Sequence, residues 1–350
     1  MTSIVISNGD LYAWGLNIKG NLGFGNINQV KTPTKVPIAE EVKFQAVSYT
    51  NEISIALDTN GEIWVCGYNR RGQLGAGQEL YTNSFIKVTG IPRIIYVKAT
   101  QSGSFLIIDE YYKVWATGNL AKVANNSLHE VFTLIADNGT IVKATANLTS
   151  LLLLDTNGLL WSLGLKHSNL SRSYIQVPST VAFTSIDINT KESMAIDNNG
   201  KLWVYNKTGV FTPEISSENM DPLNVRFIQI SMGGLYAIAV DEDGRLWSKG
   251  DNRYGQLGLG DLNSREYFTP VTLSEDVRLI SIFCGNNISN ALDEYRRLWV
   301  CGVNSLSQLG LHHDLEVNKF TLMPFDIPID ILPNSHSNYR YGKTKSAAYI

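Results

Sequence analysis

One sequence pattern recurs along the whole chain and limits the fold more than any other feature. Its fullest copy runs from Asp241 to Asp261 and reads D-E-D-G-R-L-W-S-K-G-D-N-R-Y-G-Q-L-G-L-G-D. Related copies begin at Asn8, Asp58 and Asp293. Each opens with a short polar turn and an aromatic strand, which predicts a β-hairpin, and then continues into a loop that is rich in glycine or leucine.

Three weaker copies in the middle of the chain keep the turn and the tryptophan but have lost the glycine loop. They lie at Asp109–Trp115, Asp155–Trp161 and Asp197–Trp203. One aromatic residue anchors each of the seven copies: Tyr12, Trp64, Trp115, Trp161, Trp203, Trp247 and Trp299. Subtracting their positions gives spacings of 52, 51, 46, 42, 44 and 52 residues. This regular spacing predicts a repeat array, in which residues 1–350 form a single domain.

The glycine loop carries a family resemblance. Its pattern, G-x-N-x-x-G-Q-L-G-x-G after an aromatic strand, resembles the repeat of the regulator of chromosome condensation family. The resemblance covers roughly Thr2 to Leu332, is specific in units one, two, six and seven, and implies a seven-bladed β-propeller. That family tends to carry a histidine before its inner strand, whereas the matching positions here hold other residues: Ile53, Ser104, Ser150, Glu192, Tyr236 and Ile288. The chain therefore resembles a divergent member.

Four short strands per unit, polar turns and no helical periodicity predict an all-β propeller of four-stranded blades. We expect each unit to open with its inner strand, beginning at Thr2–Ile6. A composite blade, built half from each end of the chain, is expected to close the ring and to remove the exposed sheet edge. The loop leucines are expected to fill space between blades: Leu22, Leu74, Leu257 and Leu309.

The last residues are expected to differ from the ring. Residues 334–350 are predicted to form a flexible tail. Within it, K-S-A-A-Y-I at Lys345–Ile350 looks like the start of an eighth inner strand, which either pairs elsewhere or is used by a partner.

Composition argues against several classes of function. A formal net charge of -3 gives no electrostatic case for nucleic acid or for an anionic membrane. No signal peptide or membrane-spanning run is predicted, so we expect the protein inside a cell or assembled into a particle. The cysteines, Cys66, Cys284 and Cys301, form no C-x-x-C pair and are expected to pack in the core.

Three features that resemble chemical sites have simpler structural explanations. The glycine loops lead into strands, whereas a phosphate-binding loop opens a helix. The recurring aspartates stand at turns of separate blades, where Asp accepts backbone N–H groups. His312-His313 has no third metal ligand nearby in the sequence. We therefore predict no catalytic residue, no cofactor and no metal.

Protein binding is predicted at loop tips, for which there are two candidate arcs. Arg70-Arg71 and Arg253-Tyr254 occupy the same loop position in units two and six, and exposed Arg and Tyr on a rigid scaffold suit a protein partner. The other arc consists of the units that lost the glycine loop, through segments Asn119–Asn126, His167–Ser173 and Lys207–Thr212. Solvated loop tips without a partner are the simpler alternative.

These observations predict a non-enzymatic protein–protein interaction or assembly scaffold. A structural component of a larger complex or of a virus particle falls within this class, and the Asn- and Ile-rich composition suits an AT-rich genome. The alternative, implied by the resemblance, is guanine-nucleotide exchange on a small GTPase. Exchange needs a protruding element, but no anchor spacing exceeds 52 residues. A lyase or hydrolase site in the channel is a third reading, but the strands expected to line the channel show no cluster of histidines or acids.

Overall fold

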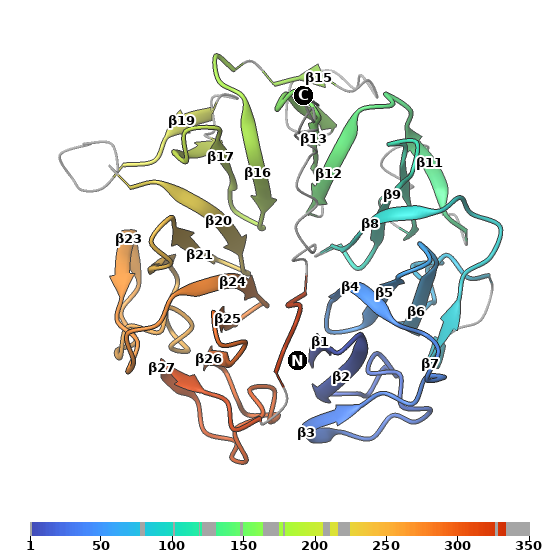
Figure 1. The fold of residues 1–350 in the computed structure, drawn as a ribbon, viewed down its shortest axis with the longest axis horizontal. Coiled ribbons are helices and arrows are strands. Elements are labelled where there is room, and N and C mark those ends of the chain that lie inside the picture. Colours follow the sequence, from blue (N-terminus) through green and yellow to red (C-terminus); the bar gives the residue numbers. More distant parts are fainter. Residues whose placement is uncertain are drawn as a thin grey trace, which may run out of the picture.

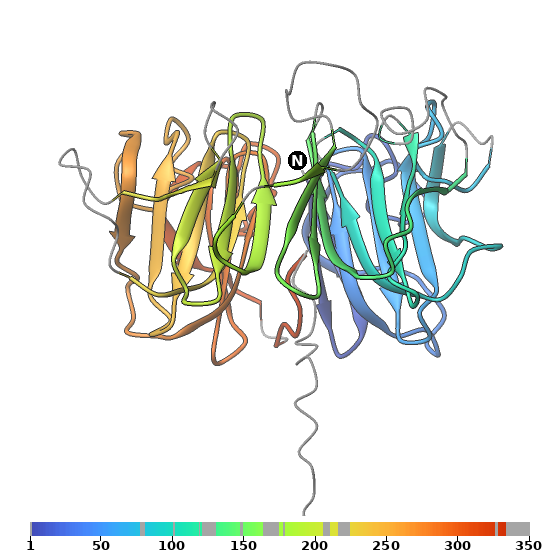
Figure 2. The same ribbon diagram turned by 90° about the horizontal axis from the view of Figure 1, so that it is seen from above.

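Seven antiparallel sheets form a ring of blades around a central axis (Figure 1). The computed structural model describes residues 2–77, 81–100, 102–118, 120, 131–147, 150–163, 175–177, 179–205, 211–215, 225–325 and 328–333. Figure 2 shows the blades standing side by side around the ring. The predicted all-β, seven-bladed propeller is confirmed.

Each blade is a meander that runs outward from the axis. The strands nearest the axis are β4 (Phe44–Tyr49), β8 (Ile94–Ala99), β12 (Ile141–Ala146), β16 (Phe183–Ile188), β20 (Phe227–Met232) and β24 (Leu279–Cys284). The second strands are β1 (Thr2–Ser7), β5 (Ile53–Asp58), β9 (Phe105–Asp109), β13 (Leu151–Asp155), β17 (Ser193–Asp197), β21 (Tyr236–Asp241) and β25 (Ile288–Asp293). The third strands, which carry the aromatic anchors, are β2 (Asp10–Gly15), β6 (Ile63–Tyr68), β10 (Val114–Ala116), β14 (Leu160–Leu163), β18 (Leu202–Tyr205), β22 (Leu246–Gly250) and β26 (Leu298–Gly302). The outer strands are β3 (Val30–Lys35), β7 (Tyr81–Lys87), β11 (Thr133–Ala136), β15 (Ile175–Gln176), β19 (Phe211–Pro213), β23 (Arg265–Val271) and β27 (Val317–Leu322).

The sequence repeat and the blade are offset by one strand. We predicted that each unit opens with its inner strand, and this is wrong, because β1 and its equivalents lie second from the axis. The fourth strand of each repeat crosses over and becomes the innermost strand of the next blade. Both registers place four strands in a repeat, so the sequence pattern alone does not distinguish them.

Segment 328–333 closes the ring at the inner edge of β1 (Figure 1). Ile331 pairs with Ile6 in an antiparallel bridge, and the hydroxyl of Ser7 donates to the Pro328 carbonyl at 2.6 Å. The backbone N–H of Asn8 donates to the Asp330 carboxylate at 2.6 Å. Closure by both ends of the chain is confirmed, but the division differs from the predicted halves, because the first blade takes three strands from β1–β3 and only this short segment from the other end.

The recurring aspartate ties each turn to the tryptophan that follows it. In the second blade, one oxygen of Asp58 accepts the backbone N–H groups of Asn60 and Glu62 at 2.9 Å each, and the other accepts the Trp64 indole N–H at 3.1 Å. The same aspartate–indole bond, at 2.9–3.1 Å, is formed in six blades by Trp64, Trp115, Trp161, Trp203, Trp247 and Trp299. The structural explanation of these aspartates is thus confirmed, and Ser7 replaces the aspartate in the first blade.

In the first, second and sixth blades, the glycine loop forms a β-bridge to the outer part of the next blade. In the second blade, Ala76 bridges to Val131 of the third blade, and Leu74 is buried at the contact. Asn69 holds the loop from inside, because its side chain accepts the Leu74 N–H and donates to the Gly77 carbonyl, both at 2.9 Å. All four loop leucines are buried as predicted: Leu22, Leu74, Leu257 and Leu309.

A matched pair of substitutions tests this contact. Gly75 and Gly77 both have positive φ, +66° and +98°, but a Cβ on Gly75 would lie 2.6 Å from the Phe132 ring, whereas Gly77 has open space around it. We expect Gly77→Ala to lower the free energy of unfolding by about 1 kcal/mol, from backbone strain alone, and Gly75→Ala to lower it by about 3 kcal/mol, because overpacking adds to the strain. Equal losses in urea unfolding would show that the blade-to-blade contact contributes nothing.

Two turns carry a side chain where four other blades carry glycine. Tyr112 and Arg296 have φ of 61° and 65°, at the position of Gly61, Gly158, Gly200 and Gly244. We expect Tyr112→Gly to raise the free energy of unfolding by about 1 kcal/mol, by relieving that strain. Arg296→Gly should gain less, because the Arg296 guanidinium forms an ion pair with Asp330 of the closing segment. Urea denaturation of both variants measures the difference, and a larger gain for Arg296→Gly would contradict the role of that ion pair.

Candidate functional site: the loop face and the axial cavity

The two faces of the ring differ in the connections that they carry. One face, here called the loop face, holds the glycine loops and the links from each innermost strand to the second strand, such as residues 50–52 and 285–287. The other, here called the turn face, holds the aspartate turns and the crossings between blades. The six innermost strands, β4, β8, β12, β16, β20 and β24, all run toward the loop face, so their final side chains meet around the axis there.

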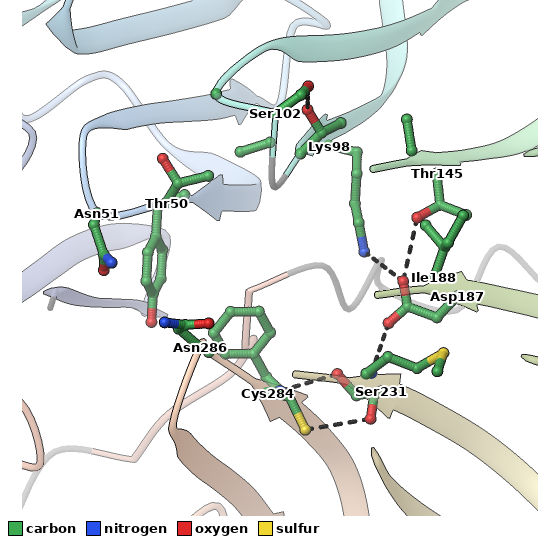
Figure 3. Close-up of a pocket in the computed structure, with 18 of the residues that line it drawn as sticks. Thr50, Asn51, Lys98, Ser102, Thr145, Asp187, Ile188, Ser231, Cys284 and Asn286 are labelled. Atoms are coloured by element: carbon green, nitrogen blue, oxygen red, sulfur yellow. Dashed lines mark hydrogen bonds and ion pairs between the residues drawn. The ribbon is translucent and has the colours of Figure 1, made fainter. Parts of the chain in front are cut away.

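An axial cavity of about 450 Å³ opens among these strand ends. Figure 3 shows that hydroxyl, amide and charged side chains from most blades point into it. Its polar lining includes Thr50, Asn51, Lys98, Ser102, Thr145, Asp187, Ser231 and Asn286. The cavity can therefore accept a ligand that forms several hydrogen bonds.

Asp187 connects its own blade, the fifth, to three other blades around this cavity. Its carboxylate accepts hydrogen bonds from the Lys98 ammonium at 3.3 Å, from the Thr145 hydroxyl at 3.2 Å and from the Met232 backbone N–H at 2.8 Å (Figure 3). The Lys98 and Asp187 side chains are only 13% and 10% exposed. Breaking such a pair leaves a buried charge without compensation, so the contact fixes the relative positions of β8 and β16.

A second lysine adds positive charge beside this pair. Lys143 donates to the Thr184 carbonyl at 3.0 Å. Burial, and then the charge of Lys98, lowers the pKa of Lys143. The sequence predicted no cluster of acids or histidines on the channel strands, but it assigned the wrong strands to the channel. The structure places one carboxylate and two ammonium groups there.

The thiol at the cavity is not set up as a nucleophile. Cys284 lines the cavity and donates to the Ser231 carbonyl at 3.2 Å. Burial raises its pKa to about 12, which keeps the thiol protonated near neutral pH. Cys66 and Cys301 are also buried, as predicted for core residues.

A side pocket of about 300 Å³ adjoins the axial cavity on the loop face. Its lining consists of Lys19, Glu52, Tyr68, Arg71, Gln73, Ser102 and Gly103. Glu52, Ser102 and Gly103 also line the axial cavity, so the two spaces share a wall. Lys19 of the first blade lies 4.7 Å above the Tyr68 ring of the second, in a cation–π contact.

The predicted binding residues fall into two groups. Arg70 and Arg71 are exposed on the second blade, and neither forms an ion pair with any described residue. Arg253 on the sixth blade pairs with Asp251 of its own loop at 2.8 Å, and Tyr254 beside it is 36% exposed. All four lie on the loop face, but the seventh and first blades separate the two groups.

The other candidate arc falls mostly outside the part of the chain that the structure describes. This applies to most of the segments Asn119–Asn126, His167–Ser173 and Lys207–Thr212, and to the tail at residues 334–350. Among the described residues, no three His, Cys, Asp or Glu side chains gather as a metal site would require. The described part also holds no helix of the length and hydropathy needed to span a bilayer.

The sequence reasoning missed two features of this face. It placed Lys19 at the same loop position as Arg71 but did not select it as a binding residue, and it did not single out Tyr68, which precedes the loop asparagine of the second blade. It also missed Asp187 and Lys98, which lie 89 residues apart, two repeats from each other. The only available signal was the unusual presence of charge inside otherwise apolar strands.

Family comparisons match the units with intact loops. The model of the regulator of chromosome condensation (RCC1) repeat matches residues 8–57 and 243–292, and a second model with the same description matches residues 44–73 and 227–256. These segments include the complete glycine loops of units one and six and the first part of the loop of unit two.

Relatives and solved structures extend the likeness over the whole ring. The RCC1 domain-containing protein RUG3, mitochondrial, from Arabidopsis thaliana is 26% identical over 318 residues, covering 87% of this chain and 63% of its own length. The ultraviolet-B receptor UVR8 from the same plant is 24% identical, covering 74% and 64%. The chain thus spans less than two thirds of either relative. The crystal structure of Prp20p from Saccharomyces cerevisiae superposes with a TM-score of 0.77 at 16% identity, covering 93% of this chain and 88% of that one. The chain thus carries repeats of the regulator of chromosome condensation (RCC1) family within residues 8–73 and 227–292, and it shares the seven-bladed fold of Prp20p.

Proposed function

We propose that this protein is a non-enzymatic scaffold that binds protein partners through its loop face. The observation that carries the proposal is the pair Arg70 and Arg71, exposed on a rigid loop and free of ion pairs within the described chain. Arg253 and Tyr254 form a second, weaker contact in this proposal, because Asp251 already neutralises the Arg253 charge.

Rigidity of the loops supports binding. The loop asparagines are buried and accept the N–H of the loop leucine at 2.9 Å: Asn17, Asn69, Asn252 and Asn304. Tip residues held in this way lose little conformational freedom when a partner binds, which favours affinity.

The family supports protein partners in general terms. Prp20p, which shares this fold, has binding properties to Gsp1p and histones. We propose in addition that the partner belongs to a larger assembly, of which a virus particle is one case. The Asn- and Ile-rich composition is the only feature that favours a particle.

Cross-linking of the purified protein to its captured partners, followed by mass spectrometry, tests the binding face. We expect cross-links at the loop face, and about tenfold weaker capture for the double variant Arg70→Glu with Arg71→Glu, because exposed Arg residues are frequent interface hot spots. Arg226→Glu on the turn face changes charge in the same direction and serves as the control. Cross-links confined to the turn face would refute the proposal, and presence in purified particles would support the particle case.

Guanine-nucleotide exchange remains the alternative, and it rests on the family resemblance alone. A nucleotide-release assay against a panel of small GTPases decides between the two. Strong acceleration by this protein would replace the scaffold proposal.

A further inference from the structure

We propose that the side pocket binds a carboxylate from an extended acidic segment of a protein partner. The proposal rests on the loop-face function above and specifies its chemistry. It rests on two cations that line the pocket, Lys19 and Arg71, and on Arg70 next to Arg71 in the chain; none of the three forms an ion pair with a described acid.

The equivalent loop of the sixth blade carries an acid that the second blade lacks, and this difference leaves Arg70 and Arg71 without an ion pair. In the sixth blade, Asp251 directly precedes the loop asparagine, Asn252. Its carboxylate accepts hydrogen bonds from the Arg253 guanidinium at 2.8 Å and from the Gln256 side-chain amide at 3.0 Å. In the second blade this position holds Tyr68. The aromatic ring supports Lys19 from the neighbouring blade at 4.7 Å instead of neutralising the arginines. The substitution therefore concentrates positive charge where the sixth blade cancels it.

The pocket has the size and the polar groups to hold a carboxylate. Arg71 and Lys19 line it, and about 300 Å³ is ample for one acidic side chain. A planar guanidinium such as that of Arg71 can bind both oxygens of a carboxylate. Glu52 also lines the pocket, and its negative charge opposes the entry of a second carboxylate.

The adjoining axial cavity provides for the residues next to that carboxylate. Its near wall presents Thr50, Asn51 and Ser102, whose side chains can pair with an extended backbone. Thr100 and Ser102 hydroxyls lie 2.7 Å apart on the same wall. An extended segment that runs from the side pocket toward the axis would therefore meet a charged site first and polar groups next.

An acidic peptide fits this surface better than nucleic acid does. Phosphate backbones need a run of cations along the strand, and the formal net charge of the chain is -3. Glu52 inside the pocket and Asp251 on the same face would repel a polyanion of uniform charge density, but they tolerate a single carboxylate.

Fluorescence anisotropy on the full chain tests the inference with defined probes. The first probe is a labelled octapeptide of alternating glutamate and glycine, the second is its glutamine counterpart, and the third is a single-stranded DNA of twelve nucleotides. The variants are Arg71→Gln and Lys19→Gln, with Arg226→Gln on the turn face as the control of equal charge change. Thermal melting confirms that each variant is folded.

We expect the glutamate peptide to bind about tenfold more tightly than the glutamine peptide, with an affinity that falls as salt is added. Arg71→Gln should weaken binding about tenfold and Lys19→Gln by a smaller factor, whereas Arg226→Gln should leave it within about twofold. Equal binding of both peptides, or binding unchanged by Arg71→Gln, would overturn the inference. Tighter DNA binding that is lost in the same variants would also overturn it, in favour of a nucleic-acid site. If only the peptide test fails while partner cross-links remain on the loop face, the carboxylate site is wrong and the scaffold proposal stands.

Discussion

Trp299→Ala is expected to lower the free energy of unfolding by about 5 kcal/mol, and Trp247→Ala by about 3 kcal/mol. Both indoles donate to the turn aspartate of their own blade at 3.0 Å. They differ in burial, because Trp299 is 0% exposed within the core between the sixth and seventh blades, whereas Trp247 is half-buried. The larger cavity at Trp299 explains the larger loss.

Urea denaturation at neutral pH measures both losses, and phenylalanine provides the control. Trp299→Phe keeps most of the apolar contact but leaves one oxygen of Asp293 without the indole N–H, so an intermediate loss is expected. Near-normal stability of Trp247→Ala, together with lost partner binding, would show that this tryptophan contacts a ligand instead of anchoring the blade.

Removal of the closing segment is expected to have the second large effect. A chain that stops at Phe325 loses the Ile331 bridge and the buried side chains of Ile329 and Leu332. Each buried aliphatic side chain contributes about 2–4 kcal/mol, and β1 becomes an unpaired edge. We expect this variant to unfold at much lower urea and to self-associate.

Light scattering after size-exclusion chromatography, together with urea denaturation, checks both effects. A chain that stops at Pro333 keeps every described closing contact and serves as the matched control. Leu332→Ala should lower stability by about 3 kcal/mol in an otherwise complete chain. A monomeric, fully stable protein without the closing segment would show that the ring does not depend on it.

The sequence predicted the features that repeat and missed those that do not. The blade number followed from seven aromatic anchors, and the aspartate turns and buried leucines followed from their fixed offsets. Each of these is a local contact or a contact between successive repeats, so the residues that form it recur several times in the sequence. The assignment of strands to the axis failed, because a shift by one strand leaves the repeat pattern unchanged.

The candidate site depends on single residues at non-repeating positions. Arg70 and Arg253 look equivalent in the sequence, yet only Arg253 is ion-paired within the described chain, because Asp251 stands where the second blade has Tyr68. Likewise, the contact of Lys98 with Asp187 joins the third and fifth blades across the axis. Such contacts require the closed ring, so periodicity in the sequence cannot predict them.

The first blade is held at a second place, far from the closing segment. The backbone carbonyl of Gln308, in the last glycine loop, accepts the Ser3 hydroxyl at 2.8 Å and the Trp14 indole N–H at 3.0 Å. Gln29 donates to the carbonyl of Leu306 in the same loop at 2.9 Å. During synthesis these contacts become available once the loop has left the ribosome, while residues 328–333 are still inside the exit tunnel. The last glycine loop can therefore bind the first blade at the loop face before the closing segment pairs with β1 at the axis. At that stage the blades are already arranged around the axis, and only the inner edge of β1 is unpaired.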